Sequence, residues 1–260
     1  NLRHRHYIKS EKYKGEIHFS TGSNTARSSS NFYALNNGIA TLFEIRGVGI
    51  GKTSFKRRIN SGLSVGFSFL KTAYENSNFI FDQIDIANTY SNDIVLEHQR
   101  SMYTDVIKAI DIGSNEMIDF ETTMHSSKDS YAISKRDRPL AYIIKQNNFG
   151  FIEKLKDVGI DYVEFKKDTV IYSGSYRVVE FNDNFKVYEK MRMQKVVTSI
   201  EYNDNGFSEG DILISMNQKR SNLIAELLEP EAPNSYVSFG IIKTSLNKQL
   251  PIYRIKNFNN

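Results

Sequence analysis

Cysteine is absent from this chain of 260 residues, which excludes disulfide bonds and thiolate metal sites. The sequence also lacks any run of about 18 apolar residues, so it contains no candidate for a membrane-spanning helix. No signal peptide stands at the start, where the first residue is Asn1 rather than Met. The absence of cysteine fits either the cytosol or a bacterial export pathway.

A strong charge of one sign is absent too, because the net charge is +4 and the pI is about 9.0. Basic residues cluster at 3–14 and 52–58, but acidic residues are interspersed elsewhere and no nucleic-acid-binding motif accompanies them. We therefore interpret the basic clusters as solvated faces and expect no nucleic-acid partner. The length allows one large domain or two modest ones with real cores.

The stretch 42–58, LFEIRGVGIGKTSFKRR, contains an incomplete match to a nucleotide-binding loop. A P-loop needs G-x-x-x-x-G-K-[ST], but Gly47 lies one residue too close to the Gly51-Lys52-Thr53 end of the motif. The dinucleotide pattern G-x-G-x-x-G also fails, since the glycines run as G-x-G-x-G. The sequence thus argues against nucleotide binding at this position.

The same stretch predicts a strand, a turn and a helix around one carboxylate, Glu44. Residues 39–43 are apolar and rich in strand formers, which predicts a buried strand that ends at Glu44. The glycines permit a tight turn, and Thr53 or Ser54 is a possible helix cap. Apolar residues then recur at helical spacing: Phe55, Ile59, Leu63, Phe67, Leu70 and Tyr74. Sites in open α/β sheets lie at the carboxyl ends of strands, so Glu44 is a candidate general base; the alternative is an ion pair with Arg46 or Arg27.

These residues also carry a resemblance. Residues 43–46, FEIR, followed by a glycine turn, resemble the E-[LI]-R segment of the zinc carboxypeptidases, the carboxypeptidase A-like metallopeptidases. The longer stretch FEIRGVGIGKTSFKRRI and residues 31–36 are similar to a bacterial branch of that family. Residues 138–144, 227–236 and 250–254 extend the similarity through the C-terminal half, whereas it is patchy between 80 and 135.

The resemblance implies a zinc metallocarboxypeptidase that removes C-terminal amino acids from peptides. Family members hold one zinc with two His and one Glu, and Glu44 matches the carboxylate that accepts a proton from the attacking water. The family also grips the terminal carboxylate of its substrate with Arg and Asn side chains, for which Arg27 and Tyr33 are the candidate substrate-binding residues here. A secreted or periplasmic location is typical of the family.

The zinc ligands that the resemblance implies are missing from this sequence. No H-x-x-E spacing occurs, and the five histidines are His4, His6, His18, His98 and His125. We expect each to be exposed or hydrogen-bonded rather than a ligand, with His18 on the solvent side of a strand. The carboxylates at 226, 229 and 231 are expected in a solvated loop rather than a metal cluster.

Two explanations account for the missing ligands. One is that the chain is the C-terminal portion of a longer enzyme whose zinc ligands lie upstream, so that the N-terminal half of the peptidase domain is its partner. The other is a degenerate homologue that has lost the ligands. Alone, the chain is not expected to hydrolyse peptides by the family mechanism.

The predicted fold is α/β: the end of a carboxypeptidase-like α/β/α sheet domain at 1–78, a connecting segment at 79–134 and a mostly β accessory domain at 135–260. A strand is expected at 116–123. The accessory domain should contain strands at 141–145, 161–165, 169–181, 188–202 and 211–216, and helices at 149–158, closed by Gly159, and at 221–228. Two function classes stay open: part of a peptidase, or a peptide-, glycan- or protein-binding module with a peptidase remnant.

Overall fold

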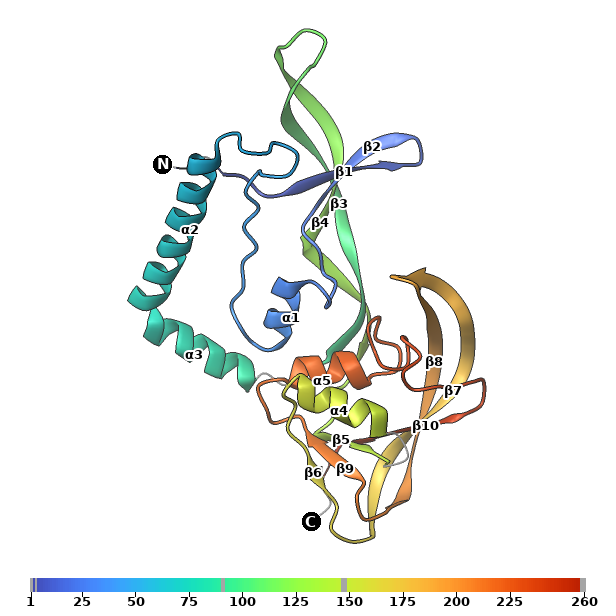
Figure 1. Ribbon diagram of the computed structural model, residues 1–260. Helices are drawn as coiled ribbons and strands as arrows, with labels where there is room; N and C mark the ends of the chain where they lie inside the picture. Colours follow the sequence, from blue (N-terminus) through green and yellow to red (C-terminus); the bar gives the residue numbers. More distant parts are fainter. Residues whose placement is uncertain (1, 3, 90–91, 146–148, 258–260) are drawn as a thin grey trace.

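The structure is a computed structural model that describes residues 2, 4–89, 92–145 and 149–257 (Figure 1). These residues form five α-helices, a mixed four-stranded sheet and a six-stranded antiparallel sheet. The prediction of a mixed α and β chain is therefore confirmed at this level. No helix within the described ranges is both long and apolar enough to cross a membrane.

The four-stranded sheet has the order β1-β2-β4-β3, in which only β2 and β4 run parallel. Its strands are β1 (Ile8–Tyr13), β2 (Glu16–Thr21), β3 (Ile94–Ile110) and β4 (Met117–Arg136). The strand expected at 116–123 is the first part of β4. The rest of the segment expected as a connection is also regular, because β3 and β4 form one long antiparallel hairpin (Figure 1). Apolar periodicity is weak here, because much of the hairpin is exposed and the residues that β4 buries include the polar Thr122 and Ser126.

The six-stranded sheet has the order β6-β9-β5-β10-β7-β8, and every neighbouring pair is antiparallel. Its strands are β5 (Ala141–Ile144), β6 (Val163–Glu164), β7 (Thr169–Tyr188), β8 (Met191–Phe207), β9 (Ile212–Ser215) and β10 (Gln249–Ile255). Each strand predicted between 141 and 216 is found, although β6 is shorter than expected. β7 and β8 extend beyond the sheet as a curved hairpin (Figure 1).

The core of the molecule lies on both faces of this sheet. Tyr142 and Ile144 of β5 contribute to the large cluster under the helices α4 (Phe149–Asp157) and α5 (Ser221–Leu228). Ala141 and Ile143, which alternate with them, belong to a smaller cluster on the other face. Both helices occur where the sequence predicts them. Gly159 follows α4 with φ +69°, a conformation that favours glycine at a helix end.

Gly174 of β7 is a position where a side chain does not fit. A Cβ atom there would lie 2.8 Å from both Ile200 Cγ2 and Tyr202 Cζ. We expect Gly174→Ala to lower the free energy of unfolding by about 1–3 kcal/mol, the usual cost of overpacking. Gly206→Ala on β8 is the matched control, because its Cβ would meet no atom within 4 Å. Urea unfolding of both variants measures the difference, and equal midpoints would contradict the packing described.

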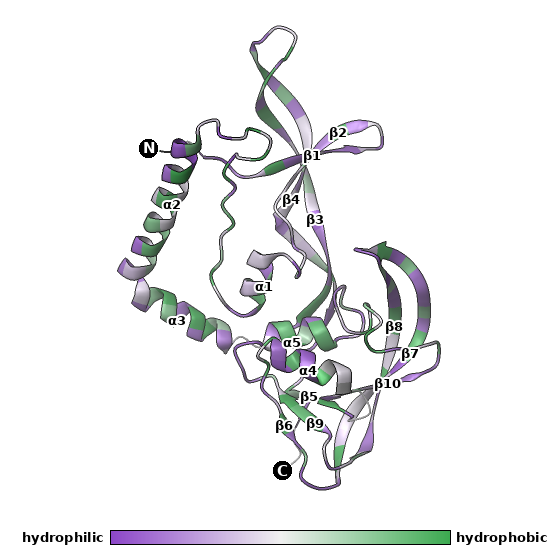
Figure 2. Cartoon of the chain, viewed as in Figure 1, coloured by the Kyte–Doolittle hydropathy of each residue, from purple (hydrophilic) through white to green (hydrophobic). Residues whose placement is uncertain are grey.

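The three remaining helices carry no buried residue: α1 (Ser29–Leu35), α2 (Phe55–Glu75) and α3 (Ser77–Asn88). α2 matches the predicted helix and begins after Ser54, but the Ser54 side chain makes no capping hydrogen bond. α2 and α3 stand apart from both sheets, and hydrophobic residues recur along them (Figures 1 and 2). The apolar positions of the predicted helical repeat in α2 are all exposed: Phe55, Ile59, Leu63, Phe67, Leu70 and Tyr74.

Candidate functional site

The segment that ends in Glu44 is extended but forms no strand, which corrects the prediction of a buried strand at 39–43. Ile39, Leu42 and Phe43 are 60%, 64% and 51% exposed, and Glu44 is exposed as well. Within the described part of the chain, residues 39–46 make no backbone–backbone hydrogen bond. A strand needs a partner for its N–H and C=O groups, and no described segment supplies one.

The glycine turn after this segment is tight, as predicted. Gly49 and Gly51 adopt φ values of +76° and +48°, which favour glycine. Arg58 of α2 holds the turn by donating from Nη1 to the Gly47 carbonyl at 3.3 Å and from Nη2 to the Gly51 carbonyl at 2.5 Å. The turn therefore fixes the direction in which the extended segment enters α2.

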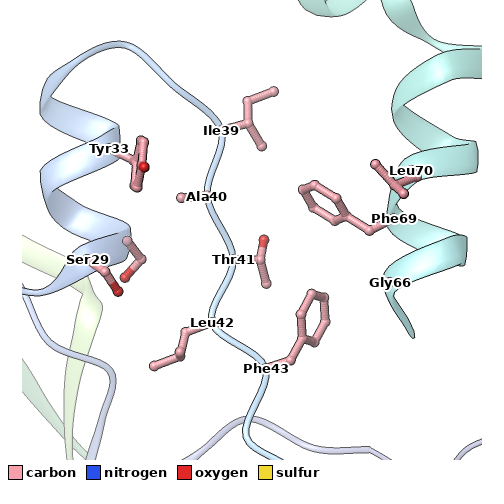
Figure 3. A pocket seen from close by; sticks show the side chains of 11 residues that line it. Ser29, Tyr33, Ile39, Ala40, Thr41, Leu42, Phe43, Gly66, Phe69 and Leu70 are labelled. Atoms are coloured by element: carbon pink, nitrogen blue, oxygen red, sulfur yellow. The ribbon is translucent and has the colours of Figure 1, made fainter. Parts of the chain in front are cut away.

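Tyr33 lies beside the extended segment (Figure 3). Together with residues 39–43 and one side of α2, it lines a groove of about 520 Å³. The side chains of Thr41 and Phe43 point toward α2, whereas Leu42 points the other way, which is the alternation of a strand (Figure 3). Phe43 also meets Phe69 edge to face at 6.3 Å between ring centroids.

Arg27 does not line this groove. Its guanidinium carbon lies 3.3 Å from the centre of the Tyr188 ring, and Arg27 lines a different cavity, between the two sheets. The two predicted substrate-binding residues thus face separate hollows. The ion pair that was the alternative role of Glu44 is not present among the described residues.

The prediction that His18 faces solvent is wrong. His18 is buried, while its neighbour Ile17 is half exposed. Its Nδ1 lies 2.9 Å from Nε2 of His125, and its Nε2 lies 3.3 Å from a carboxylate oxygen of Glu16. β2 pairs with β4, so which face of β2 is buried depends on a strand whose His125 lies 107 residues from His18 in the sequence. Both histidines have hydrogen-bond partners, as expected of non-ligand histidines.

Across the described ranges, no three His, Asp or Glu side chains gather closely enough to hold a metal ion.

The carboxylates after α5 are not solvated, which corrects a second prediction. Glu229 has no exposed surface and receives hydrogen bonds from Arg136 Nη1 at 2.6 Å, Tyr142 Oη at 2.5 Å and Tyr176 Oη at 2.9 Å. Glu231 binds Arg136 Nη1 at 2.7 Å and Nη2 at 3.0 Å. One arginine therefore binds both carboxylates inside the domain and offsets part of their negative charge.

The pKa values of this network keep its donors protonated. Burial, followed by the Glu229 charge, raises the pKa of Tyr142 well above its usual value, and the same two causes act on Tyr176. Burial would lower the pKa of Arg136, but the hydrogen bond with Glu231 and the charges of Glu229 and Glu231 outweigh it and raise the pKa. We interpret the network as structural, since its buried hydroxyls and the Glu229 carboxylate hydrogen-bond within the protein.

Glu226 belongs to a different environment and gives a pH prediction. Burial raises its pKa, and its Oε1 accepts a hydrogen bond of 2.6 Å from Asn234 Nδ2. A raised pKa in the folded state favours folding at low pH, and this contribution is lost as the pH rises through the folded-state pKa. Between about pH 4 and pH 8, the wild type should therefore lose stability relative to Glu226→Gln, by about 1.4 kcal/mol per unit of pKa shift. Urea unfolding at several pH values measures this, and parallel pH profiles for the two proteins would contradict it.

With this geometry described, comparison with known proteins shows a distant relation to fungal carboxypeptidases. The chain is 29% identical over 236 residues to carboxypeptidase 2 of Trichophyton equinum, covering 87% of this chain and 43% of that protein. It is 25% identical over 253 residues to carboxypeptidase 2 of Trichophyton tonsurans, covering 96% of this chain and 47% of that protein. The probable carboxypeptidase 2 of Arthroderma benhamiae is 27% identical over 209 residues, with 76% and 39% covered.

The chain thus spans less than half the length of these relatives. No protein-family model matches it, and no solved structure matches it significantly. The relatives are fungal, so the similarity to a bacterial branch stays a prediction. The relation to carboxypeptidases agrees with the family resemblance of the sequence.

Proposed function

We propose that this chain supplies Glu44 as the general base of a zinc-dependent carboxypeptidase that removes C-terminal amino acids from peptides. The observation that carries the proposal is the position of Glu44. It stands at the end of an extended apolar segment with an unpaired backbone, directly before a glycine turn and an amphipathic helix. The relatives named carboxypeptidase 2 support the reaction class.

The unpaired segment and the uncovered helix favour the same arrangement. An extended segment with free N–H and C=O groups is suited to join a sheet as an added strand. The apolar face of α2, with Phe67 and Leu70 among its exposed residues, is suited to cover a face of that sheet. We propose that the sheet belongs to the N-terminal half of the peptidase domain, in polypeptide outside these 260 residues, and that the assembled domain is an α/β/α sandwich.

The chemistry follows from this placement. The described residues do not include a fitting set of zinc ligands, so we assign the ligands to the N-terminal half as well. Zinc, when bound, lowers the pKa of a water molecule and polarises a carbonyl group. The Glu44 carboxylate accepts a proton from the attacking water and passes it to the amine of the leaving amino acid. Tyr33, which lines the groove beside Phe43, is the proposed substrate contact on this side.

The full-length protein tests this function. It should release the last residue from peptides that end in a free carboxylate, and it should leave the same peptides with an amidated C-terminus intact. A chelator should abolish the release, and added zinc should restore it. Release that persists in excess chelator, or equal cleavage of amidated peptides, would overturn the proposal. No release from any peptide would favour the binding-module alternative.

Hydrogen exchange tests the assembly separately from catalysis. In the 260-residue chain, the amides of residues 40–46 should exchange at close to the unprotected rate, because they lack backbone partners. In the full-length protein we expect them to exchange at least about 100-fold more slowly, since sheet hydrogen bonds then protect them. The amides of β5 serve as the control and should be protected in both proteins. Equal exchange of 40–46 in both would contradict the added strand.

A further inference from the structure

The four-stranded sheet has an apolar face that is partly exposed. The pairing register places on it large apolar side chains from β2, β3 and β4, and we call these residues the apolar sheet face: Ile17, Phe19, Tyr103, Ile107, Ile118 and Phe120. Ile17, Tyr103 and Ile118 are 50%, 43% and 39% exposed. Phe19 and Phe120 meet edge to face at 6.3 Å between ring centroids, as expected of neighbours on one face. Contiguous exposed apolar surface of this kind is typical of an interaction site.

Part of the apolar sheet face lies on a two-stranded ribbon. Among the described residues, β2 pairs with β4 over 123–126, whereas β3 and β4 continue to pair as far as Ile110 and Met117. The ribbon projects beyond the rest of the molecule, and hydrophobic residues recur along it (Figures 1 and 2). A two-stranded hairpin alone is only marginally stable in water and needs further strands or another packed layer. The apolar side of the ribbon is therefore suited to be covered by a partner.

Two residues of opposite charge flank the apolar sheet face. Lys12 of β1 is the register partner of Ile17, and Thr122 Oγ1 donates to the Ile17 carbonyl at 2.9 Å. Thr122 in turn is the register partner of Asp105 on β3. These residues form one row across the sheet, and β1 and β3 are its outer strands, so the two charges stand at opposite ends of the row. Neither Lys12 nor Asp105 has an ion-pair partner among the described residues.

This arrangement of charges is self-complementary. Sheets commonly pack face to face, and most homo-oligomers are dimers with a twofold axis. A twofold axis that runs parallel to the strands, between two copies of the sheet, exchanges the outer strands. Lys12 of each copy then faces the partner's Asp105, and the apolar residues of the two copies meet between the two ion pairs. A partner with a surface charge of one sign would satisfy only one of the two residues, so the charges favour a second copy.

We propose that the apolar sheet face binds the same face of a second copy of this protein and forms a symmetric dimer. The apolar residues supply the contact area, and two Lys12–Asp105 ion pairs fix the register of one copy on the other. The inference is independent of the proposed peptidase function, because self-association is measured without zinc and without substrate.

Analytical ultracentrifugation of the full-length protein tests the proposal. We expect a dimer with a micromolar or lower dissociation constant, the range of specific interfaces of ordinary size. A protein that is still a monomer at about 100 µM would overturn the proposal. The apolar sheet face would then be covered by the rest of the same polypeptide or by a different protein.

Charge reversal locates the interface. In a dimer of Lys12→Glu, both ion pairs become contacts between two carboxylates, and in a dimer of Asp105→Lys both become contacts between two ammonium groups. Each variant should dimerise at least about 10-fold more weakly than the wild type, because like charges across an interface repel. An equal mixture of the two variants should associate within about threefold of the wild-type affinity, since both contacts of the mixed dimer again join opposite charges. A mixture that associates no more tightly than each variant alone would overturn the proposal.

Glu11→Lys is the matched control. Glu11 precedes Lys12 on β1 and is the register partner of His18, so its side chain points to the opposite face of the sheet. The affinity of this variant should stay within about twofold of the wild type, as expected of a surface substitution away from the interface. Circular dichroism verifies that all three variants are folded. A loss of affinity in Glu11→Lys equal to that in Lys12→Glu would show a general effect of charge reversal on β1 and would also overturn the proposal.

Discussion

Substitution of Glu44 by Gln is expected to lower kcat for release of a C-terminal amino acid about 10²- to 10⁴-fold in the full-length protein, the usual contribution of a positioned general base. Gln is close to Glu in shape but cannot accept the proton, so KM should change little. Stopped or continuous assays on peptides with varied C-terminal residues measure both constants. Because Gln keeps the size and polarity of Glu, we expect the variant to fold as the wild type does, which keeps the result interpretable.

The control for this prediction is Glu75→Gln at the end of α2, where the carboxylate pairs with Lys71 at 3.7 Å on the surface. Its kcat should stay within about twofold of the wild type, since exposed pairs of this kind contribute little. Undiminished cleavage by the Glu44 variant would remove Glu44 from the mechanism. Equal losses in both variants would point instead to a general effect on the domain.

Replacement of Glu229 by Ala is expected to destabilise the chain by about 3–5 kcal/mol, the cost of removing one partner from a buried ion pair. Glu229 has no exposed surface, and its removal leaves the hydroxyls of Tyr142 and Tyr176 without their acceptor. Arg136 keeps Glu231, so the loss should lie toward the lower end of this range. Urea unfolding followed by tyrosine fluorescence measures it, because the chain has 15 tyrosines and no tryptophan.

The matched control is Glu201→Ala on β8. Glu201 also faces an arginine, but the pair with Arg177 spans 3.9 Å and both side chains are about half exposed. Solvent screens such a pair, so the change should stay within about 1 kcal/mol. If the Glu229 and Glu201 variants unfold at the same urea concentration, the buried network is not a major source of stability.

The local sequence correctly predicted those helices in which the apolar repeat and the residues at the helix ends indicate the same bounds. The helix at 221–228 occurs with the predicted bounds, and α2 begins where the apolar repeat begins, at Phe55. Gly159 ends α4 because a helix end that requires positive φ selects glycine, a preference that is visible in the sequence. β3 and most of β4 were missed, because much of the hairpin is exposed and two of the residues that β4 buries, Thr122 and Ser126, are polar.

Some features of the candidate site were likewise predictable from the local sequence, and others were not. Glu44 is proposed from a short motif, and the tight turn after it followed from the glycines. The cavity around Arg27 could not be predicted, because its lining comes from segments far apart in the sequence, among them β3, β7 and α5. Tyr188 likewise contacts Arg27 only in the folded chain, because the two residues come from distant parts of the sequence.

The sequence by itself determined the types and order of most C-terminal elements, the absence of disulfides and the single carboxylate to test first. Tertiary structure alone decided which polar residues are buried. Glu229 is 93 residues from Arg136 and His18 is 107 residues from His125, so neither partner is visible locally. The physical reason is that periodicity reports only that one face of an element is apolar, whereas burial of a charged or polar group depends on the partner that arrives from elsewhere in the chain.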